Sequence, residues 1–341
     1  LDLLSDTHVM YCVTKQISEI NARPWSIEPV DDKPKSKEVA QFVEKNLKQI
    51  GSQVEDAING EAIVSANDGF GSLISGLALA YIVGHYPAEI IWTKREKGRI
   101  WAKDIKIKDP RRFTYIGDDE GNIFPRLLTV QDSFTGEPLP PRKFIFNRYW
   151  TYMNEDPFGA GLGRQIYYPV TWKRQALSFW LNFIDKSTTP VALGTHPEDA
   201  DPEQVIEFFR DLSNLGQETA IVVPENWAVS FLQSENKAID AFSGLIAYCD
   251  KAISLSILGE ATTGESQPGS RAKDEVSNSI RIKRAEALSD SINETLNNTL
   301  VKWIVQLNYG PKVVPPRIVR PFAYIDPAGL LATATGLEQI G

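Results

Sequence analysis

Two long helical segments that lead out to a small unit and back again constrain this fold more than any other feature. The segments, residues 165–188 and 235–257, repeat apolar residues at intervals of three or four, the spacing of a helix with a buried face. Residues 189–234 between them read as a strand, a helix and two further strands. Enzymes seldom carry a small unit on a two-helix stalk, whereas ring-shaped channels use parallel stalks to wall the pore. The pattern therefore favours structural machinery over a catalyst.

The small unit carries nearly the whole net charge of the chain, which is −8. Residues 189–234 contain eight acidic residues and a single base, Arg210, an excess of seven negative charges. A protein that grips DNA phosphates tightly shows the opposite sign. Two interpretations stay open: a docking surface, or a solvated helix face in which Asp201 caps the helix and Glu203 complements its dipole. The candidate docking residues are Glu198, Asp199, Asp201, Glu203, Glu207 and Asp211.

The cysteines and histidines indicate neither a metal site nor a disulfide framework. Cys12 and Cys249 lie far apart, and His8, His85 and His196 are isolated from one another. Metal sites and disulfide scaffolds need clustered ligands or cysteine pairs, so we expect a reducing compartment. Hydrophobic residues make up 42% and charged residues 23% of the chain, which is typical of a folded globular protein.

The glycine-rich segment 264–271 has the glycine spacing of a phosphate-binding P-loop but lacks its chemistry. Arg271 follows Ser270 where the motif needs lysine and then serine or threonine, and the preceding segment is helical. The glycines of residues 159–163 do not complete a dinucleotide motif and are interpreted as a hinge. Neither a nucleophile elbow nor a paired-carboxylate signature stands out. We therefore expect no cofactor and no enzymatic activity.

The remaining segments predict an α+β fold. Residues 1–60 read as helix, strand and helix, and residues 81–150 as one antiparallel sheet with helices against one face. Residues 272–310 predict a helix that is ~55 Å long at about 1.5 Å per residue, and residues 317–325 predict a strand that returns to the earlier sheet. The longest apolar stretch, 73–86, falls short of the ~20 residues that a membrane span needs. The sequence begins at a leucine and ends inside a helical pattern, so we expect truncation at both ends.

Seven short motifs together carry a resemblance to a known family over nearly the whole chain. They are Arg23-Pro-Trp-Ser-Ile-Glu-Pro29, Asp109-Pro-Arg-Arg-Phe113, Pro157-Phe-Gly-Ala-Gly-Leu-Gly163, Pro169-Val-Thr-Trp-Lys-Arg174, Ile221-Val-Val-Pro-Glu225, Ile257-Leu-Gly259, and Gly269-Ser-Arg-Ala272 with Glu275-Val276. Their number and order make the match specific. On these motifs the chain resembles the portal proteins of tailed bacteriophages, in particular the Mu-like group.

The resemblance implies a subunit with a wing, a two-helix stem, a clip reached through the stem, a tunnel loop and a C-terminal crown. The implied parts are the wing at 1–164, the first stem helix at 165–188, the clip at 189–234, the second stem helix at 235–257, the tunnel loop at 258–271, the long wing helix at 272–310, a strand returning to the wing at 311–326, and the start of a truncated crown at 327–341. The loop departs from the family pattern, because Glu260 follows Gly259 where the family typically has glutamine and then a threonine-rich run.

The resemblance also implies a function. Portal proteins form a ring, most often of twelve subunits, at one vertex of the capsid, where they meet the major capsid protein after assembly in the host cytoplasm. Double-stranded DNA passes through the ring without sequence-specific contacts during packaging and ejection. ATP hydrolysis belongs to the terminase large subunit, which docks on the clip before the head–tail adaptor replaces it. The residues implied to face the DNA are Glu260, Thr262, Thr263, Glu265, Gln267, Arg271 and Lys273.

Other interpretations of the residues remain. A different ring- or tube-forming phage component, from the tail or baseplate, is also consistent with the residues. An acidic carbohydrate-active enzyme would explain the tryptophans and carboxylates, but the long helices contradict the compact barrel or sandwich that it would need. The tunnel loop could also be an ordinary solvent-exposed connector, which is what most glycine-rich loops are.

Overall fold

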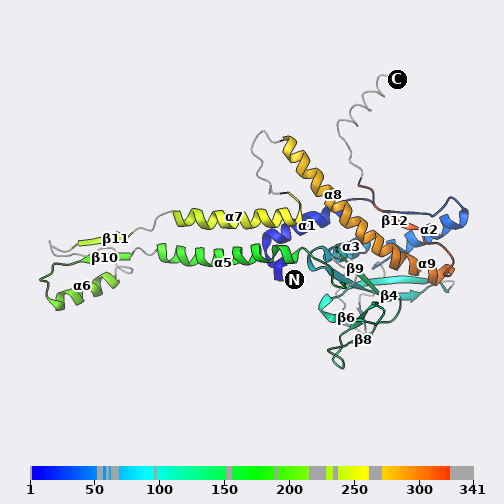
Figure 1. Cartoon of the computed structure of the whole chain (residues 1–341), viewed down its shortest axis with the longest axis horizontal. Coiled ribbons are helices and arrows are strands. Elements are labelled where there is room, and N and C mark those ends of the chain that lie inside the picture. Colours follow the sequence, from blue (N-terminus) through cyan, green and yellow to red (C-terminus); the bar gives the residue numbers. More distant parts are fainter. Residues whose placement is uncertain are drawn as a thin grey trace, which may run out of the picture. The chain divides into compact units, whose positions relative to one another are not determined.

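The computed structural model describes residues 2–51, 57–58, 61–62, 69–95, 98–150, 156–188, 191–214, 228–232, 237–260 and 271–322. The chain divides into two compact units. Unit 1 consists of Leu1–Tyr167 with Ser254–Gly341, and unit 2 of Tyr168–Ile253. The mixture of long helices and antiparallel sheets confirms the predicted α+β class (Figure 1).

The N-terminal part of unit 1 confirms the predicted order of helix, strand and helix. A short 3-10 turn, Asp2–Ser5, precedes α1 (Thr7–Asn21). The side chain of its N-cap, Asp6, accepts hydrogen bonds from the backbone amides of His8 and Val9. Strand β1 (Ser26–Glu28) leads to α2 (Pro34–Lys48), and a two-strand hairpin follows, β2 (Ala57–Ile58) with β3 (Glu61–Ala62). Helix α2 begins at its proline, because proline has no amide hydrogen to leave unpaired in a first turn.

The prediction of a single antiparallel sheet over 81–150 is wrong, because the strands form two sheets. The first has the order β5-β4-β9, from Ile100–Ile107, His85–Lys94 and Phe144–Arg148. The second has the order β6-β7-β8, from Phe113–Gly117, Ile123–Leu127 and Glu137–Pro138. A 3-10 turn, Pro110–Arg112, separates them in the chain. Aromatic packing connects them, since the ring of Phe113 lies 5.4 Å from that of Phe146.

Helices cover the first sheet and close the core of unit 1. Helix α3 (Phe70–Ala78), followed by α4 (Ala80–Val83), contacts β4, β5, α1 and α8. The long C-terminal helix is α8 (Arg271–Leu296), continued by a π-helical turn, Asn297–Val301, and by α9 (Lys302–Tyr309). This run confirms the predicted helix over 272–310. Its second half supplies buried apolar side chains to the core: Leu288, Ile292, Leu296, Leu300 and Ile304.

The predicted return of the C-terminal strand to the earlier sheet is also wrong. Strand β12 (Arg317–Val319) pairs antiparallel with β1, and Ile318 lies opposite Ile27. The side chain of Asn297 fixes this strand, because its Oδ1 accepts from Ile318 N at 2.8 Å. Residues 323–341, including the predicted crown, lie outside the described residues.

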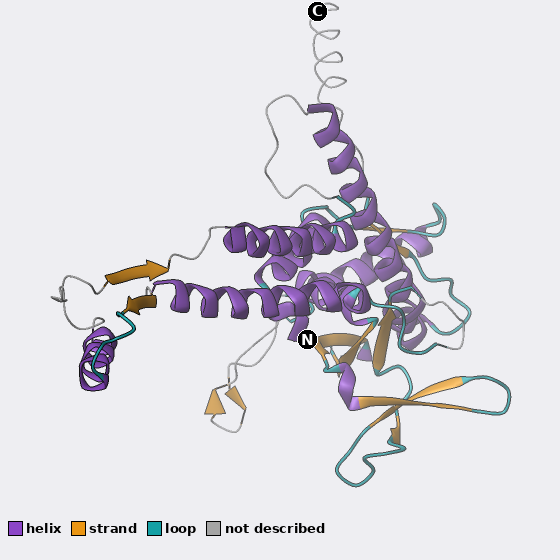
Figure 2. Ribbon diagram, turned by 60° about the vertical axis from the view of Figure 1, so that its left-hand side comes forward, coloured by secondary structure: helices purple, strands orange, loops and turns teal. Residues whose placement is uncertain are grey.

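Unit 2 contains two long helices and a small α/β tip. Helix α5 (Gly163–Thr188), which begins in unit 1, and α7 (Lys237–Ile257) lie side by side in both views (Figures 1 and 2). The tip consists of β10 (Val191–Thr195), α6 (Pro202–Asn214) and β11 (Ala228–Leu232), and β10 pairs antiparallel with β11. The predicted strand at 219–223 lies outside the described residues. Across the described parts of the chain, we find no helix long and apolar enough to cross a bilayer.

Candidate functional surfaces

The start of α5 is fixed to the end of α4 by backbone packed on backbone. A Cβ on Gly161 would lie 2.3 Å from both Gly84 N and Ile82 O. A Cβ on Gly84 would in turn lie 2.5 Å from a carbonyl of the facing loop, and Gly84 has a positive φ of 106°. The interpretation of residues 159–163 as a hinge is therefore wrong. These glycines allow a close approach that side chains would prevent.

Tyr81 links the start of α5 to the end of α7 within unit 1. Its carbonyl accepts from Leu162 N at 2.9 Å, and its hydroxyl donates to Ile257 O at 2.5 Å. Arg284 of α8 donates to Ser256 O at 2.7 Å. A cation and a hydroxyl at a helix C-terminus satisfy carbonyls that have no partner inside the helix. Burial raises the pKa of Tyr81 to about 12, so the phenol remains a donor at neutral pH.

A second polar contact joins α1 to the last turn of α7. Nε2 of His8 lies 2.7 Å from Oγ of Ser254, and Sγ of Cys12 lies 3.8 Å from the same oxygen. Ser254 and Cys12 are fully buried. The serine–histidine contact therefore joins two helices and does not present a nucleophile to a substrate. In the described residues, no group of three or more histidine, cysteine or acidic side chains could hold a metal ion.

Of the residues implied to face DNA, Glu260 has the best defined surroundings. Its side chain is buried, and Oε1 accepts from Nζ of Lys15 on α1 at 3.2 Å. The carboxylate is thus engaged by a cation of α1 in the same chain rather than presented to solvent. Arg271 and Lys273 lie in the first turn of α8. Four further candidates lie outside the described residues: Thr262, Thr263, Glu265 and Gln267.

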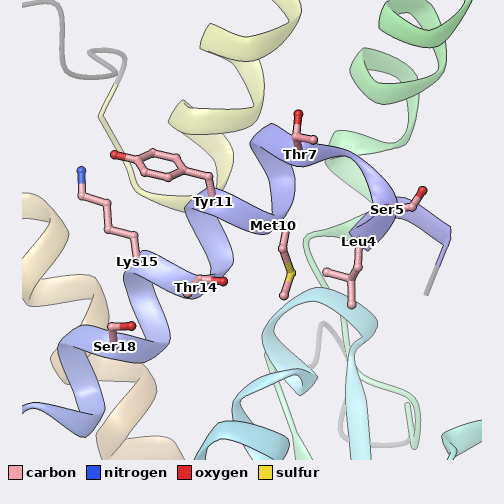
Figure 3. Close-up of a pocket in the computed structure, with 8 residues that line it drawn as sticks. All are labelled: Leu4, Ser5, Thr7, Met10, Tyr11, Thr14, Lys15 and Ser18. Atoms are coloured by element: carbon pink, nitrogen blue, oxygen red, sulfur yellow. The ribbon is translucent and has the colours of Figure 1, made fainter.

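A groove of about 720 Å³ runs along α1 beside that ion pair (Figure 3). The exposed side chains of Met10 and Tyr11 form its apolar part, and Thr7, Thr14 and Lys15 add hydroxyls and one cation. The ammonium of Lys15 lies 5.7 Å from the centre of the Tyr11 ring. This lining has the mixture of aromatic, apolar and hydroxyl groups of a protein contact surface and offers no general base.

The six candidate docking acids lie together on the tip of unit 2, and all are exposed. Oδ1 of Asp201 accepts from Glu203 N at 3.2 Å, so Asp201 caps α6. Glu203, Glu207 and Asp211 follow at intervals of four, which places their carboxylates on one face of α6. The helix-cap interpretation of Asp201 is therefore confirmed. The exposed row of carboxylates on the same helix is also compatible with a docking role.

The opposite side of α6 forms the small core of the tip. The Phe208 ring is buried against β10, where a Cβ on Gly194 would lie 2.5 Å from it. Phe209 and Ile206 are exposed. The sequence alone left open which aromatic residues face inward, and the structure assigns Phe208 to the core and Phe209 to the surface. Trp227 lies outside the described residues, as does the side chain of Phe231.

Helix α5 carries exposed apolar residues on two opposite sides. One row is Tyr168, Trp172 and Phe179, and the other is Leu177, Leu181 and Ile184. At 3.6 residues per turn these rows point in roughly opposite directions. The side between the rows faces α7. There Nζ of Lys173 lies 2.7 Å from Oδ1 of Asp250, and the rings of Trp180 and Phe242 stack at 6.4 Å.

Sequence reasoning missed Tyr81, Arg284 and Ser254. No local pattern could have identified them, because each acts on a partner that is distant in sequence. Tyr81 and Ile257 are separated by 176 positions, and His8 and Ser254 by 246. The glycine-rich run 157–163 did carry a signal, which indicated a special backbone but not whether it was a hinge or a tight contact.

Comparison with known proteins agrees with this fold. The portal protein of Escherichia phage Mu is 23% identical over 308 residues, which cover 89% of this chain and 55% of that protein. The Mu-like prophage FluMu protein gp29 of Haemophilus influenzae is 22% identical over 342 residues, which cover 98% of this chain and 61% of that protein. The chain thus spans little more than half the length of these relatives.

A solved structure with the same fold comes from the neck of an empty gene transfer agent particle. It aligns with a TM-score of 0.63 at 11% identity and covers 100% of this chain and 88% of the other. The family model described as the portal protein of Mu bacteriophage matches residues 1–341. Because that match covers the whole chain, the protein belongs to the Mu bacteriophage portal family, whose members are structural components of the phage particle.

Proposed function

We propose that this chain assembles into a closed ring, most favourably of twelve copies, whose central channel passes double-stranded DNA during packaging and ejection. The two apolar rows on opposite sides of α5 are the main support. Phe179 is 62% exposed and Leu181 is 68% exposed, and burial of such rows is strongly favourable. One helix with contact surfaces on opposite sides needs a neighbour on each side. Head-to-tail contacts of this kind close into a ring when the rotation between copies closes.

Native mass spectrometry of the full-length protein tests this proposal. A closed oligomer of about twelve copies is the expected result, and particles with a central hole should appear in electron micrographs. A stable monomer at micromolar concentration would contradict the ring. An open tube or sheet would instead favour the tail or baseplate alternative.

The clip is the proposed docking surface for the terminase large subunit and later for the head–tail adaptor. The exposed carboxylates of Glu203, Glu207 and Asp211 form a row that complements a basic surface, and complementary charge mainly raises association rates. Changing all three to lysine should abolish capture of the terminase while rings still form. The matched control changes Asp119 and Glu120, which are exposed acids in a turn of unit 1. Unchanged capture by the clip variant would move docking elsewhere.

The loop over 258–271 is the proposed DNA-facing rim of the channel, and the wing is the proposed contact with the major capsid protein. Two acids and no base lie between Gly259 and Ser270, a composition that repels phosphates weakly. Because Glu260 pairs with Lys15, reversal of its charge would also disturb the wing. Glu265→Lys alone is therefore the sharper test, and it should slow packaging or trap DNA without changing ring size. Glu260→Gln is its control for effects on folding, and normal packaging by Glu265→Lys would exclude contact with DNA there.

A further inference from the structure

The loop between β7 and β8, residues 128–136, displays two apolar side chains in solvent. Val130 is fully exposed and Phe134 is 90% exposed. Folded proteins expose single apolar side chains routinely, but a pair on one ordered loop tip is typical of a contact surface. We call residues 128–136 the Asp132 loop, because Asp132 organises it.

Hydrogen bonds fix the shape of the Asp132 loop. Oδ1 of Asp132 accepts from the backbone amides of Phe134 and Thr135 at 3.3 and 2.9 Å, and Oδ2 accepts from the Thr135 hydroxyl. Thr129 and Asp132 also exchange two bonds, Thr129 N to Asp132 O at 3.0 Å and Asp132 N to Thr129 Oγ1 at 3.1 Å. A loop held this way loses little conformational freedom on binding, which favours its use as a rigid knob.

The Asp132 loop is also charged at neutral pH. The hydrogen bond from the Thr135 hydroxyl, with those from backbone amides, lowers the pKa of Asp132 to about 2. The loop therefore presents a carboxylate between Val130 and Phe134. A complementary site would be an apolar pocket with cations at its edge.

Unit 1 contains such a pocket, of about 360 Å³, between the two sheets. Phe113, Leu139 and Phe144 supply apolar walls. Three cations and two carboxylates also line the pocket. The cations are Lys108, Arg112 and Lys143, and the carboxylates are those of Glu89 and Glu137. Glu89 accepts from Lys108 at 2.8 Å and from Lys143 at 2.9 Å. The three cations thus exceed the two carboxylates by one positive charge. We call this cavity the sheet pocket.

We propose that the Asp132 loop of one copy inserts Phe134 into the sheet pocket of the next copy in the ring. Leu127 and Glu137, at the two ends of the loop, line the pocket of the same chain, whereas the exposed Phe134 does not line it. A loop of one copy seated in the pocket of the next is a head-to-tail contact, which closes a ring when the rotation between copies allows it. The inserted ring meets Phe113 and Phe144, and the carboxylate of Asp132 meets Arg112. This inference rests on the proposed ring and adds a second subunit contact to that of the stem helices.

Cross-linking between two single-cysteine variants tests the contact. Full-length Phe134→Cys and Leu139→Cys chains are co-expressed, purified as rings and treated with a short bismaleimide. The native Cys12 and Cys249 are buried and should not react. A covalent dimer is expected only in mixed rings. Val314→Cys, which is also exposed, replaces Phe134→Cys in the matched control and should give none.

The proposal is overturned if rings form but the mixed pair gives no covalent dimer. A dimer of Phe134→Cys with itself also overturns it, because that product requires a symmetric contact. Capture of the capsid protein by Phe134→Cys in assembled particles overturns it too. Failure to form rings at all would instead count against the proposed function. As an independent readout, Phe134→Ser should raise the concentration needed for ring assembly about tenfold, and Ser133→Ala should leave it unchanged.

Discussion

Unit 1 and unit 2 bury their apolar residues in different ways. In unit 1, helices α1, α3 and α8 pack on one another, α3 and α8 also pack on the first sheet, and side chains such as Ile292 and Leu77 are inaccessible to solvent. In unit 2, α5 directs one face to α7 and leaves apolar rows exposed on two others. Unit 1 therefore has a core of its own, whereas α5 of unit 2 keeps apolar side chains in solvent that only the proposed contacts with neighbouring copies would bury.

The largest effect should come from the core of unit 1. Ile292→Ala removes a fully buried side chain from α8 and should lower the free energy of unfolding by about 4 kcal/mol, through lost burial and the cavity left behind. Chemical denaturation followed by circular dichroism measures this loss. Ile206→Ala on the exposed side of α6 is the control and should change it by less than about 0.5 kcal/mol. Equal losses of unfolding free energy in both variants would contradict the difference in burial between the two units.

The glycine contact at the start of α5 should be nearly as sensitive. Gly161→Ala places a methyl group 2.3 Å from backbone atoms of residues 82 and 84, which cannot move aside as a side chain would. We expect a loss of about 3 kcal/mol. Gly71→Ala, with nothing within 4 Å of the added carbon, should change stability by no more than about 1 kcal/mol, in the stabilising direction. A tolerated Gly161→Ala would restore the hinge interpretation.

The link through Tyr81 should have an intermediate effect. Tyr81→Phe removes the donor to Ile257 O and should cost about 1.5 kcal/mol, with faster hydrogen exchange in the last turn of α7. Tyr149→Phe removes a hydroxyl from the adjacent ring, 4.7 Å away, without touching that carbonyl. If the two variants show the same exchange, Tyr81 does not hold the end of α7.

Tyr81 also predicts a response to alkaline pH. Its folded pKa is raised to about 12 by burial, above the ordinary value near 10. The folded state therefore binds the phenol proton more tightly than the unfolded state does. Stability from this group is fully present below about pH 10 and is lost between about pH 10 and 12. Denaturation curves in that range should decline less steeply for Tyr81→Phe than for the unchanged protein.

The smallest effect on folding should come from the exposed rows of unit 2. Phe179→Ser should change the free energy of unfolding by less than about 0.5 kcal/mol, because the ring is already in water. The same change should weaken ring assembly, which sedimentation at decreasing concentrations measures. Tyr11→Ser, which removes an exposed aromatic ring from the groove along α1, is the matched variant in unit 1 for the same two measurements. A variant at Phe179 that unfolds early but assembles normally would reverse the assignment of the row to subunit contacts.

Periodicity in the sequence determined the helices and their order. The apolar spacing located α5, α7 and the long helix of α8 and α9 to within a few residues, and it predicted two helices within residues 1–60, because a helix needs only local hydrogen bonds and one apolar face. Turn residues and β-branched or aromatic runs also indicated the β-rich segment over 81–150, but not its strands β7 and β8. The acidic row of α6 and its Asp201 cap follow from the sequence for the same local reason.

Tertiary structure alone decided how these elements join. Strand β9 pairs with β4 across more than fifty residues, and β12 pairs with β1 across almost the whole chain. Pairing partners are selected by packing and loop closure rather than by strand sequence. For the same reason, the sequence could not show that the glycines of residues 159–163 pack against Gly84, and it favoured a hinge there. The sequence also placed Glu260 in a loop without a partner, whereas the fold brings Lys15 to it. The charge of a side chain is known from the sequence, but only the fold determines which group pairs with it.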